Sequence, residues 1–189
     1  MKLILASASP RRRDILDAAK ISYVVRPSSA DETYPDDMAA VDVPELLARR
    51  KAEAVAREAE ADAVVIGADT VVLLDGKLLG KPRDEAEAKA MLRSLSGRAH
   101  QVVSGIAVVA GSTCLTDTVI TNVEMRVLSD EEIDAYVRRD HPLDKAGAYG
   151  IQEAAGLFVT GIQGDYYNVV GLPLCRLGEL LAKVGFPLF

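Results

Sequence analysis

The sequence predicts an α/β protein in which a mixed, twisted sheet is flanked by helices. Short apolar runs bounded by turn-forming residues predict strands, and longer amphipathic segments with capping residues predict helices. The two kinds of segment alternate irregularly along the chain, which favours a mixed sheet over a regular repeating unit. With 189 residues and 49% hydrophobic content, the chain can build one sizeable core. We therefore expect a single domain over residues 1–189, with room for two lobes.

The first part of the chain predicts two strands, two helices and a hairpin. Residues 2–6 and 21–25 are apolar runs typical of strands, and the proline at position 10 favours a helix that begins there. Residues 28–37 form an acidic loop, and residues 43–60 predict a second helix with an apolar stripe. Residues 63–82 predict a buried strand, a break at 67–69 and a hairpin that turns at Asp75 and Gly76.

The second part predicts three helices and three strands. A helix is expected over residues 84–95 with Asp84 as its N-cap, followed by strands over 101–109 and 113–127. Ser129 and Glu132 form a capping-box pattern that opens the next helix. Residues 141–153 predict a loop, residues 156–162 a short strand, and residues 173–184 a final helix.

Composition excludes several classes of function. The formal net charge of -6 argues against a general nucleic-acid or membrane surface and favours a local basic pocket for a small anion. The apolar run at the N-terminus is too short for a signal peptide and no stretch is long enough to span a bilayer, so we expect a cytoplasmic protein. Cys114 and Cys175 show no metal-site or disulfide spacing, and we expect both to be buried apolar thiols.

The segment SASPRRR places three arginines at the start of the first predicted helix. Cations are unfavourable at this end, because it carries the positive pole of the helix dipole and unpaired N–H groups. A bound anion would relieve the conflict, and guanidinium groups are well suited to phosphate oxygens. The alternative is a solvated basic turn that Ser9 caps.

Candidate carboxylates lie in two places. Asp69 follows a predicted strand at a glycine-containing break, where functional carboxylates are common, although it could simply cap a turn. Asp31 and Glu32 lie in the acidic loop and could be no more than solvated charges. Because the chain has only two histidines, carboxylates together with substrate phosphates, binding Mg²⁺ or Mn²⁺, are a better-supported metal site than imidazoles.

Lysines supply the remaining candidates, each weak by itself. Lys81 lies between Gly80 and Pro82 at the end of the predicted hairpin arm, where a lysine can also serve only to protect a sheet edge. Lys51 and Lys145 carry no stronger signal alone. A covalent serine mechanism is not expected, because Ser7 and Ser9 do not lie in a G-x-S-x-G motif.

Taken together, the motifs resemble those of the Maf-like nucleoside triphosphate pyrophosphatases, in the same order and over essentially the whole chain. The segments that carry the resemblance are SASPRR, the DE of ADETY, RRKAEAVA, GADTVV, LLGKPRDEAEAKAMLRSLSG, HQVVSGIAVV, LDKAGAYGIQ and YYNVVGLPL. The resemblance implies two lobes with a central cleft, a fold similar to that of the inosine triphosphate pyrophosphatases. It also implies hydrolysis of a nucleoside triphosphate to the monophosphate and pyrophosphate, a divalent metal cofactor (Mg²⁺ or Mn²⁺) and, weakly, a homodimer.

The resemblance also implies roles for particular residues. Asp69 matches the catalytic acid or base, and Glu32 and Asp69 would hold the metal. The other matching positions concern substrate choice or the polar pocket; they are Ser7, Arg11, Arg12, Lys51, Thr70, Lys81 and Gln152. One departure is Glu153, because members of the family often have a glycine directly after the matching glutamine. Arg13 lies at a variable position and is expected to be a solvated charge.

The sequence is compatible with three functions. AGAYGIQ resembles the subgroup that acts on dTTP and UTP, and the Gln152 amide can both donate to and accept from a uracil or thymine edge. Gln152 could instead only tie down the loop around Gly150. The other two functions are a 7-methyl-GTP pyrophosphatase, as in a sister subgroup, and a nucleotide-binding regulator of septum formation.

Overall fold

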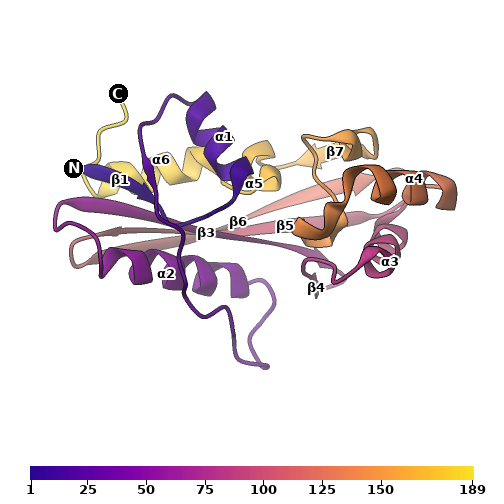
Figure 1. The fold of residues 1–189 in the computed structure, drawn as a ribbon, viewed down its shortest axis with the longest axis horizontal. Helices are drawn as coiled ribbons and strands as arrows, with labels where there is room; N and C mark the ends of the chain where they lie inside the picture. The colour runs from indigo at the N-terminus through magenta and orange to yellow at the C-terminus, as the bar shows by residue number, and fades with distance from the viewer. The chain divides into compact units, whose positions relative to one another are not determined.

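The computed structural model describes residues 1–189 and has a seven-stranded mixed sheet, which confirms the predicted fold class (Figure 1). The strands are β1 (Lys2–Leu5), β2 (Val24–Val25), β3 (Ala63–Leu74), β4 (Lys77–Leu79), β5 (Ala99–Ala110), β6 (Thr113–Met125) and β7 (Val159–Gln163). Their order is β2-β1-β3-β5-β6-β7, with β4 paired to β3. β1 is parallel to β2 and β3, whereas the β3–β4 and β6–β7 pairs are antiparallel.

Six α-helices and three short 3₁₀ helices accompany the sheet. The α-helices are α1 (Pro10–Ala18), α2 (Val43–Ala56), α3 (Glu85–Leu95), α4 (Asp130–Asp140), α5 (Tyr166–Val170) and α6 (Leu174–Lys183). The 3₁₀ helices are η1 (Pro142–Asp144), η2 (Ala146–Ala148) and η3 (Ala154–Leu157). None of these helices is both long enough and apolar enough to span a bilayer.

The chain divides into two compact units. The first unit comprises residues 1–70, 104–119 and 171–189, and the second comprises residues 71–103 and 120–170. Three of the four boundaries therefore fall inside β3, β5 and β6, and the fourth falls between α5 and α6. A single domain over residues 1–189 stays a prediction.

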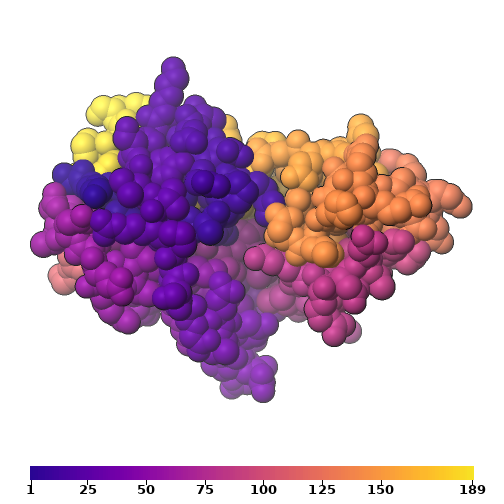
Figure 2. All heavy atoms as spheres, viewed as in Figure 1, coloured from indigo at the N-terminus to yellow at the C-terminus, as the bar shows by residue number.

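In the first unit, α2 covers one face of the sheet, and α1 and α6 cover the other (Figure 1). Small side chains of α2, including Ala48 and Ala52, pack with Ile4 and Val65 in one buried apolar cluster. The small side chains allow helix and sheet to approach closely. The predicted acidic loop runs between β2 and α2. In the space-filling view, the purple part of the chain that contains this loop forms a protrusion (Figure 2).

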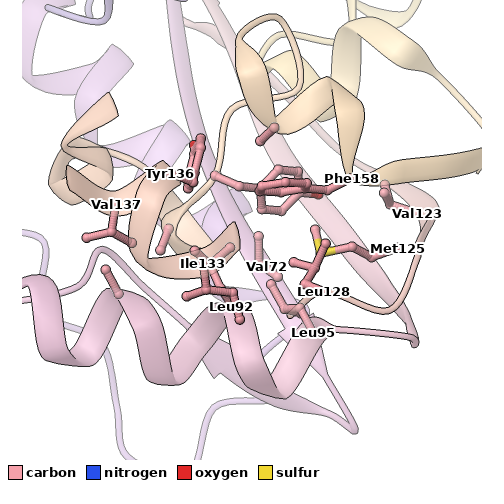
Figure 3. Packing of buried hydrophobic residues seen from close by; sticks show 14 of the residues in the cluster. Val72, Leu92, Leu95, Val123, Met125, Leu128, Ile133, Tyr136, Val137 and Phe158 are labelled. Atoms are coloured by element: carbon pink, nitrogen blue, oxygen red, sulfur yellow. The ribbon is translucent and has the colours of Figure 1, made fainter. Parts of the chain in front are cut away.

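The second unit has its own apolar core, which is built largely from α3, α4 and the ends of the long strands (Figure 3). Tyr136 of α4 packs edge-on against Phe158, with ring centroids 5.2 Å apart. Leu92 and Leu95 of α3 and Ile133 of α4 are fully buried in the same cluster. This core supports the loop between α4 and β7, which carries the predicted site residue Gln152.

The predicted helix starts are confirmed. The side chain of Asp84 accepts a hydrogen bond from the N–H of Glu87 at 2.8 Å, and Ser129 and Glu132 form both bonds of a capping box. Ser9 occupies the N-cap position of α1, but its side chain makes no capping bond. Its N–H instead donates to Ser7 Oγ at 3.2 Å.

The predicted break at residues 67–69 is wrong, because β3 runs unbroken from Ala63 to Leu74. Gly67 does not interrupt the strand but lets α2 pack closely against it. A Cβ atom at this position would lie 2.0 Å from the carbonyl oxygen of Ala48 in α2 and 2.9 Å from the Cβ of Ala52. Only glycine therefore allows α2 to pack this closely on the strand.

Other differences are local. The strand expected over residues 21–25 is reduced to Val24–Val25, and the helix expected to reach residue 60 ends at Ala56. The short helix α5 is absent from the prediction. The expectation of two buried thiols is also wrong, since Cys175 is exposed and Cys114 is only half-buried.

Candidate active site

Arg12 of α1 is the centre of a polar network in the first unit. Its guanidinium donates from Nε to the carbonyl oxygen of Gly171 at 2.8 Å, from Nη1 to Ser7 Oγ at 3.0 Å and from Nη2 to Thr70 Oγ1 at 3.2 Å. Burial lowers the pKa of Arg12, the charge of Asp69 opposes this effect, and neighbouring Arg11 adds to it. Arg11 and Arg12 thus concentrate positive charge at the start of α1, and three hydrogen bonds hold the Arg12 guanidinium in one orientation.

Lys51 of α2 links two carboxylates. Its ammonium nitrogen lies 2.7 Å from Asp69 Oδ1 and 2.8 Å from Glu32 Oε1. The Lys51 and Asp69 side chains are only 14% and 16% exposed, whereas the Glu32 side chain is 65% exposed. The acidic loop, α2 and β3 therefore meet at one cluster of three charged side chains, and Glu32 is its most exposed member.

Seven predicted site residues lie in this first unit: Ser7, Arg11, Arg12, Glu32, Lys51, Asp69 and Thr70. The contacts above join six of them in two sets of three, Ser7–Arg12–Thr70 and Glu32–Lys51–Asp69. The charges of Arg11, Asp69 and Glu32 all act on Arg12. Asp69 does not cap a turn, because it lies within β3 next to Thr70. Three cationic side chains and two carboxylates are thus available to a ligand that carries both phosphate groups and a metal ion.

The paired carboxylates fit a divalent cation. Glu32 and Asp69 already converge on one cationic centre, the Lys51 ammonium, and no third His, Cys, Asp or Glu joins them as a potential ligand. Mg²⁺ is commonly held by one or two carboxylates, with waters and substrate phosphates completing its shell. Glu32 and Asp69 are therefore the residues that would hold such an ion together with a polyphosphate.

The two remaining predicted residues, Lys81 and Gln152, belong to the second unit and are both exposed. The carbonyl oxygen of Gly80, directly before Lys81, accepts a hydrogen bond from the N–H of Gly147 at 3.1 Å. The end of the hairpin arm is thereby joined to the loop that contains Gln152. The Gln152 side chain makes no hydrogen bond within the protein, so it does not tie down this loop.

Two participants in the network were not predicted. Ser104 of β5 is fully buried, and its hydroxyl lies 2.8 Å from Thr70 Oγ1. A serine inside the apolar run QVVSGIAVV is a usable signal, because a buried hydroxyl needs a partner. The Gly171 carbonyl accepts from both Arg12 and Thr70, and a backbone acceptor leaves no signal in the sequence.

Comparison with known proteins identifies the class of protein. A family model described as "Maf-like protein" matches residues 2–184, so the chain belongs to the Maf-like family, as the motifs predict. Two of its relatives are named dTTP/UTP pyrophosphatase: one from Alkaliphilus metalliredigens (47% identical, covering 96% of this chain and 95% of the relative) and one from Symbiobacterium thermophilum (48%, covering 100% and 96%). A Bacillus cereus protein of the same name is 48% identical, over 93% of this chain and 92% of its own.

Solved structures give a weaker comparison. A Ham1 protein from Staphylococcus aureus has a TM-score of 0.49 at 16% identity, covering 66% of this chain and 72% of its own. A HAM1 protein from Coxiella burnetii has a TM-score of 0.47 at 16% identity, covering 97% and 99%. Similarity at this level carries no argument about the site.

Proposed function

We propose that this protein hydrolyses dTTP and UTP to the corresponding monophosphates and pyrophosphate. The observation that carries the proposal is the identity of 47% and 48%, over nearly the whole chain, to relatives named dTTP/UTP pyrophosphatase. The charged cluster around Lys51 and Arg12 supports it, because it offers the groups that a triphosphate and its metal ion require.

Charge balance explains the basic side of the site. A nucleoside triphosphate carries about four negative charges at neutral pH, and more charge develops on the leaving pyrophosphate. Arg11, Arg12 and Lys51 would bind the phosphate oxygens, and Lys81 of the second unit is assigned the same role. Because Arg12 is held by three protein acceptors before any ligand binds, its charge needs little rearrangement during the reaction.

We assign to Asp69 the removal of a proton from the attacking water. Its Oδ1 is engaged by Lys51, which leaves Oδ2 as the oxygen that would accept a proton from water. The water oxygen then forms a bond to the α-phosphorus, and the bond from that phosphorus to the bridging oxygen breaks. Pyrophosphate leaves with the bridging oxygen, and the proton is released to solvent through Asp69.

The metal is assigned to Glu32 and Asp69. A bound Mg²⁺ or Mn²⁺ would supply compensation for the charge of the phosphate oxygens. Lys51 would keep the two carboxylates in place when no ion is bound. The homodimer and the cytoplasmic location stay predictions.

Base selection is assigned to Gln152, with Arg11 and Thr70 contributing to substrate choice. The free amide of Gln152 can satisfy both a carbonyl acceptor and the N–H donor of a uracil or thymine edge. A site built to pair such groups rejects a mismatched base because its own polar atoms would be left unpaired.

A panel of nucleotides tests the proposal. We expect kcat/KM for dTTP and UTP to exceed that for ATP, GTP and CTP by at least about 100-fold, because a mismatched base leaves polar groups unpaired. A preference for 7-methyl-GTP would show that the substrate assignment is wrong, and the proposed hydrolysis to a monophosphate and pyrophosphate would still stand. Binding of nucleotides without any release of pyrophosphate would instead favour a regulatory protein.

A further inference from the structure

Lys145 is a buried lysine that the proposed mechanism does not use. Its side chain is only 7% exposed, and its ammonium nitrogen lies 2.9 Å from Asp144 Oδ1 and 3.2 Å from Glu153 Oε2. A buried ammonium requires carboxylate partners to compensate for its lost hydration. Asp144 is its neighbour in the chain, so the contact with Glu153 is the one that joins separate parts of the loop.

Glu153 ends a tight turn that contains Gln152. The N–H of Glu153 donates to the carbonyl oxygen of Gly150 at 3.1 Å, so residues 150–153 form one four-residue turn. Ile151 and Gln152 are its two central residues. The exposed Gln152 side chain has no hydrogen bond of its own within the protein, so the backbone of this turn sets the point and the direction from which that side chain extends.

Lys145 holds both ends of the turn. A Cβ atom at Gly150 would lie 2.9 Å from Cε and 3.1 Å from Cδ of Lys145, so the lysine stem lies directly against the buried glycine. The ammonium at the end of the same stem pairs with Glu153. One side chain therefore fixes the first and the last residue of the turn that presents Gln152.

We propose that Lys145 and Glu153 are positioning residues for base selection, acting as an ionic clamp on the turn that carries Gln152. The inference rests on the proposed function, since it names what holds the base-selecting side chain. Neither residue needs to touch the nucleotide in this role. Breaking the clamp releases the turn, and Gln152 then samples orientations in which it no longer distinguishes a carbonyl from an amino group on the base.

Two variants remove the clamp while changing side-chain volume little. Glu153→Gln keeps the size of the side chain and removes its charge, and Lys145→Met keeps an unbranched apolar stem and removes the ammonium. Glu131→Gln is the matched control, because Glu131 is an exposed glutamate of α4 in the same unit with no ion-pair partner. If Lys145→Met fails to fold, Glu153→Gln decides the question.

Hydrogen exchange of the full-length, ligand-free protein is the first readout. We expect the amides of residues 147–154 to exchange about tenfold faster in both variants and unchanged in Glu131→Gln, because local opening no longer breaks an ion pair. The second readout is the ratio of kcat/KM for UTP to that for CTP. We expect it to fall about three- to tenfold, mainly through the KM for UTP, with the double variant no worse than either single one.

Hydrogen exchange tests whether the clamp exists, and the UTP-to-CTP ratio tests its role in base selection. Faster exchange with an unchanged UTP-to-CTP ratio would overturn the role in base selection, and unchanged exchange in a folded Glu153→Gln protein would overturn the clamp. If the wild-type protein hydrolyses no nucleotide, the proposed function fails, together with the role in base selection. Hydrogen exchange still decides whether the clamp exists.

Discussion

The Lys51 ammonium lies 2.7 Å from Asp69 Oδ1, and this contact depends on how closely α2 approaches β3. Gly67 lies two residues before Asp69, on the same strand, and its missing side chain is what admits the backbone of α2 at Ala48. Lys51 is three residues further along that helix. The glycine therefore helps to set the distance between the helix and the carboxylate.

The first prediction concerns the chemistry of Asp69. Asp69→Asn is nearly isosteric and retains a partner for Lys51 in Glu32, so we expect it to fold normally. Loss of a general base typically lowers kcat by about 10²- to 10⁴-fold. The measurement is kcat with dTTP alongside a thermal unfolding curve. A folded variant with kcat within about tenfold of wild type would contradict the assignment.

The second prediction concerns Arg12, which we expect to contribute to stability as well as binding. Arg12→Ala removes three hydrogen bonds, to Ser7, Thr70 and the Gly171 carbonyl, which should cost about 2–4 kcal/mol of unfolding free energy. Arg13→Ala is the matched control, since Arg13 is exposed, and it should change stability by less than about 0.5 kcal/mol. Urea unfolding of both variants checks this. Equal stabilities would show that the Arg12 network does not support the fold.

The third prediction concerns the metal. Excess EDTA should abolish turnover, and Glu32→Gln should raise the Mg²⁺ concentration needed for half-maximal activity by about tenfold or more, since it removes one of two carboxylate ligands. Asp31→Asn is a neighbouring control, because the Asp31 carboxylate accepts hydrogen bonds from Thr33 and does not pair with Lys51. Full activity in excess EDTA would refute the metal requirement. An identical response of both variants would remove Glu32 from the metal site.

The fourth prediction concerns stability at mildly acidic pH. His100 is buried, and desolvation lowers its pKa from 6.5 to about 4. Between these values the unfolded chain binds a proton that the folded protein does not, so unfolding free energy falls as the pH falls. The loss approaches about 3 kcal/mol by pH 4. Glu132 has a pKa lowered from 4.5 to about 2 by its hydrogen bonds to Arg126 and the Ser129 N–H, so its contribution to stability is lost between these two values, below most of the range in which His100 acts.

Urea unfolding from pH 7 to pH 4 tests this account of His100. His100→Gln should lose most of the slope between pH 6.5 and pH 4.5, while His141→Gln should keep it, because His141 is exposed. The same slope in all three proteins would show that His100 does not control stability in this range.

Local signals in the sequence were sufficient for most of the fold. Capping residues such as Asp84 and Ser129 act within one turn of their helices, so the pattern alone predicts where those helices begin. Gly67 was misread because a glycine in a strand can mark either a break or a close approach, and only the position of α2 distinguishes the two. The helix α5 is too short to show a periodic pattern.

The candidate site was predicted to a similar extent. The motif match selected Lys51, Asp69 and Glu32, which the structure joins by ion pairs. It could not show that Arg12 is held by the carbonyl of Gly171, because this contact joins residues 159 positions apart through a backbone atom. The ion pair between Lys145 and Glu153 was also invisible, because it depends on the path of the loop between them.

The products of UTP hydrolysis can be followed by ³¹P nuclear magnetic resonance with Mg²⁺ and the purified wild-type protein. We expect UMP and pyrophosphate to appear in equal amounts as UTP disappears, and Asp69→Asn to slow the formation of both equally. Formation of UDP and orthophosphate, or no loss of UTP while the folded protein still binds it, would contradict the claim that this protein is a pyrophosphate-releasing hydrolase.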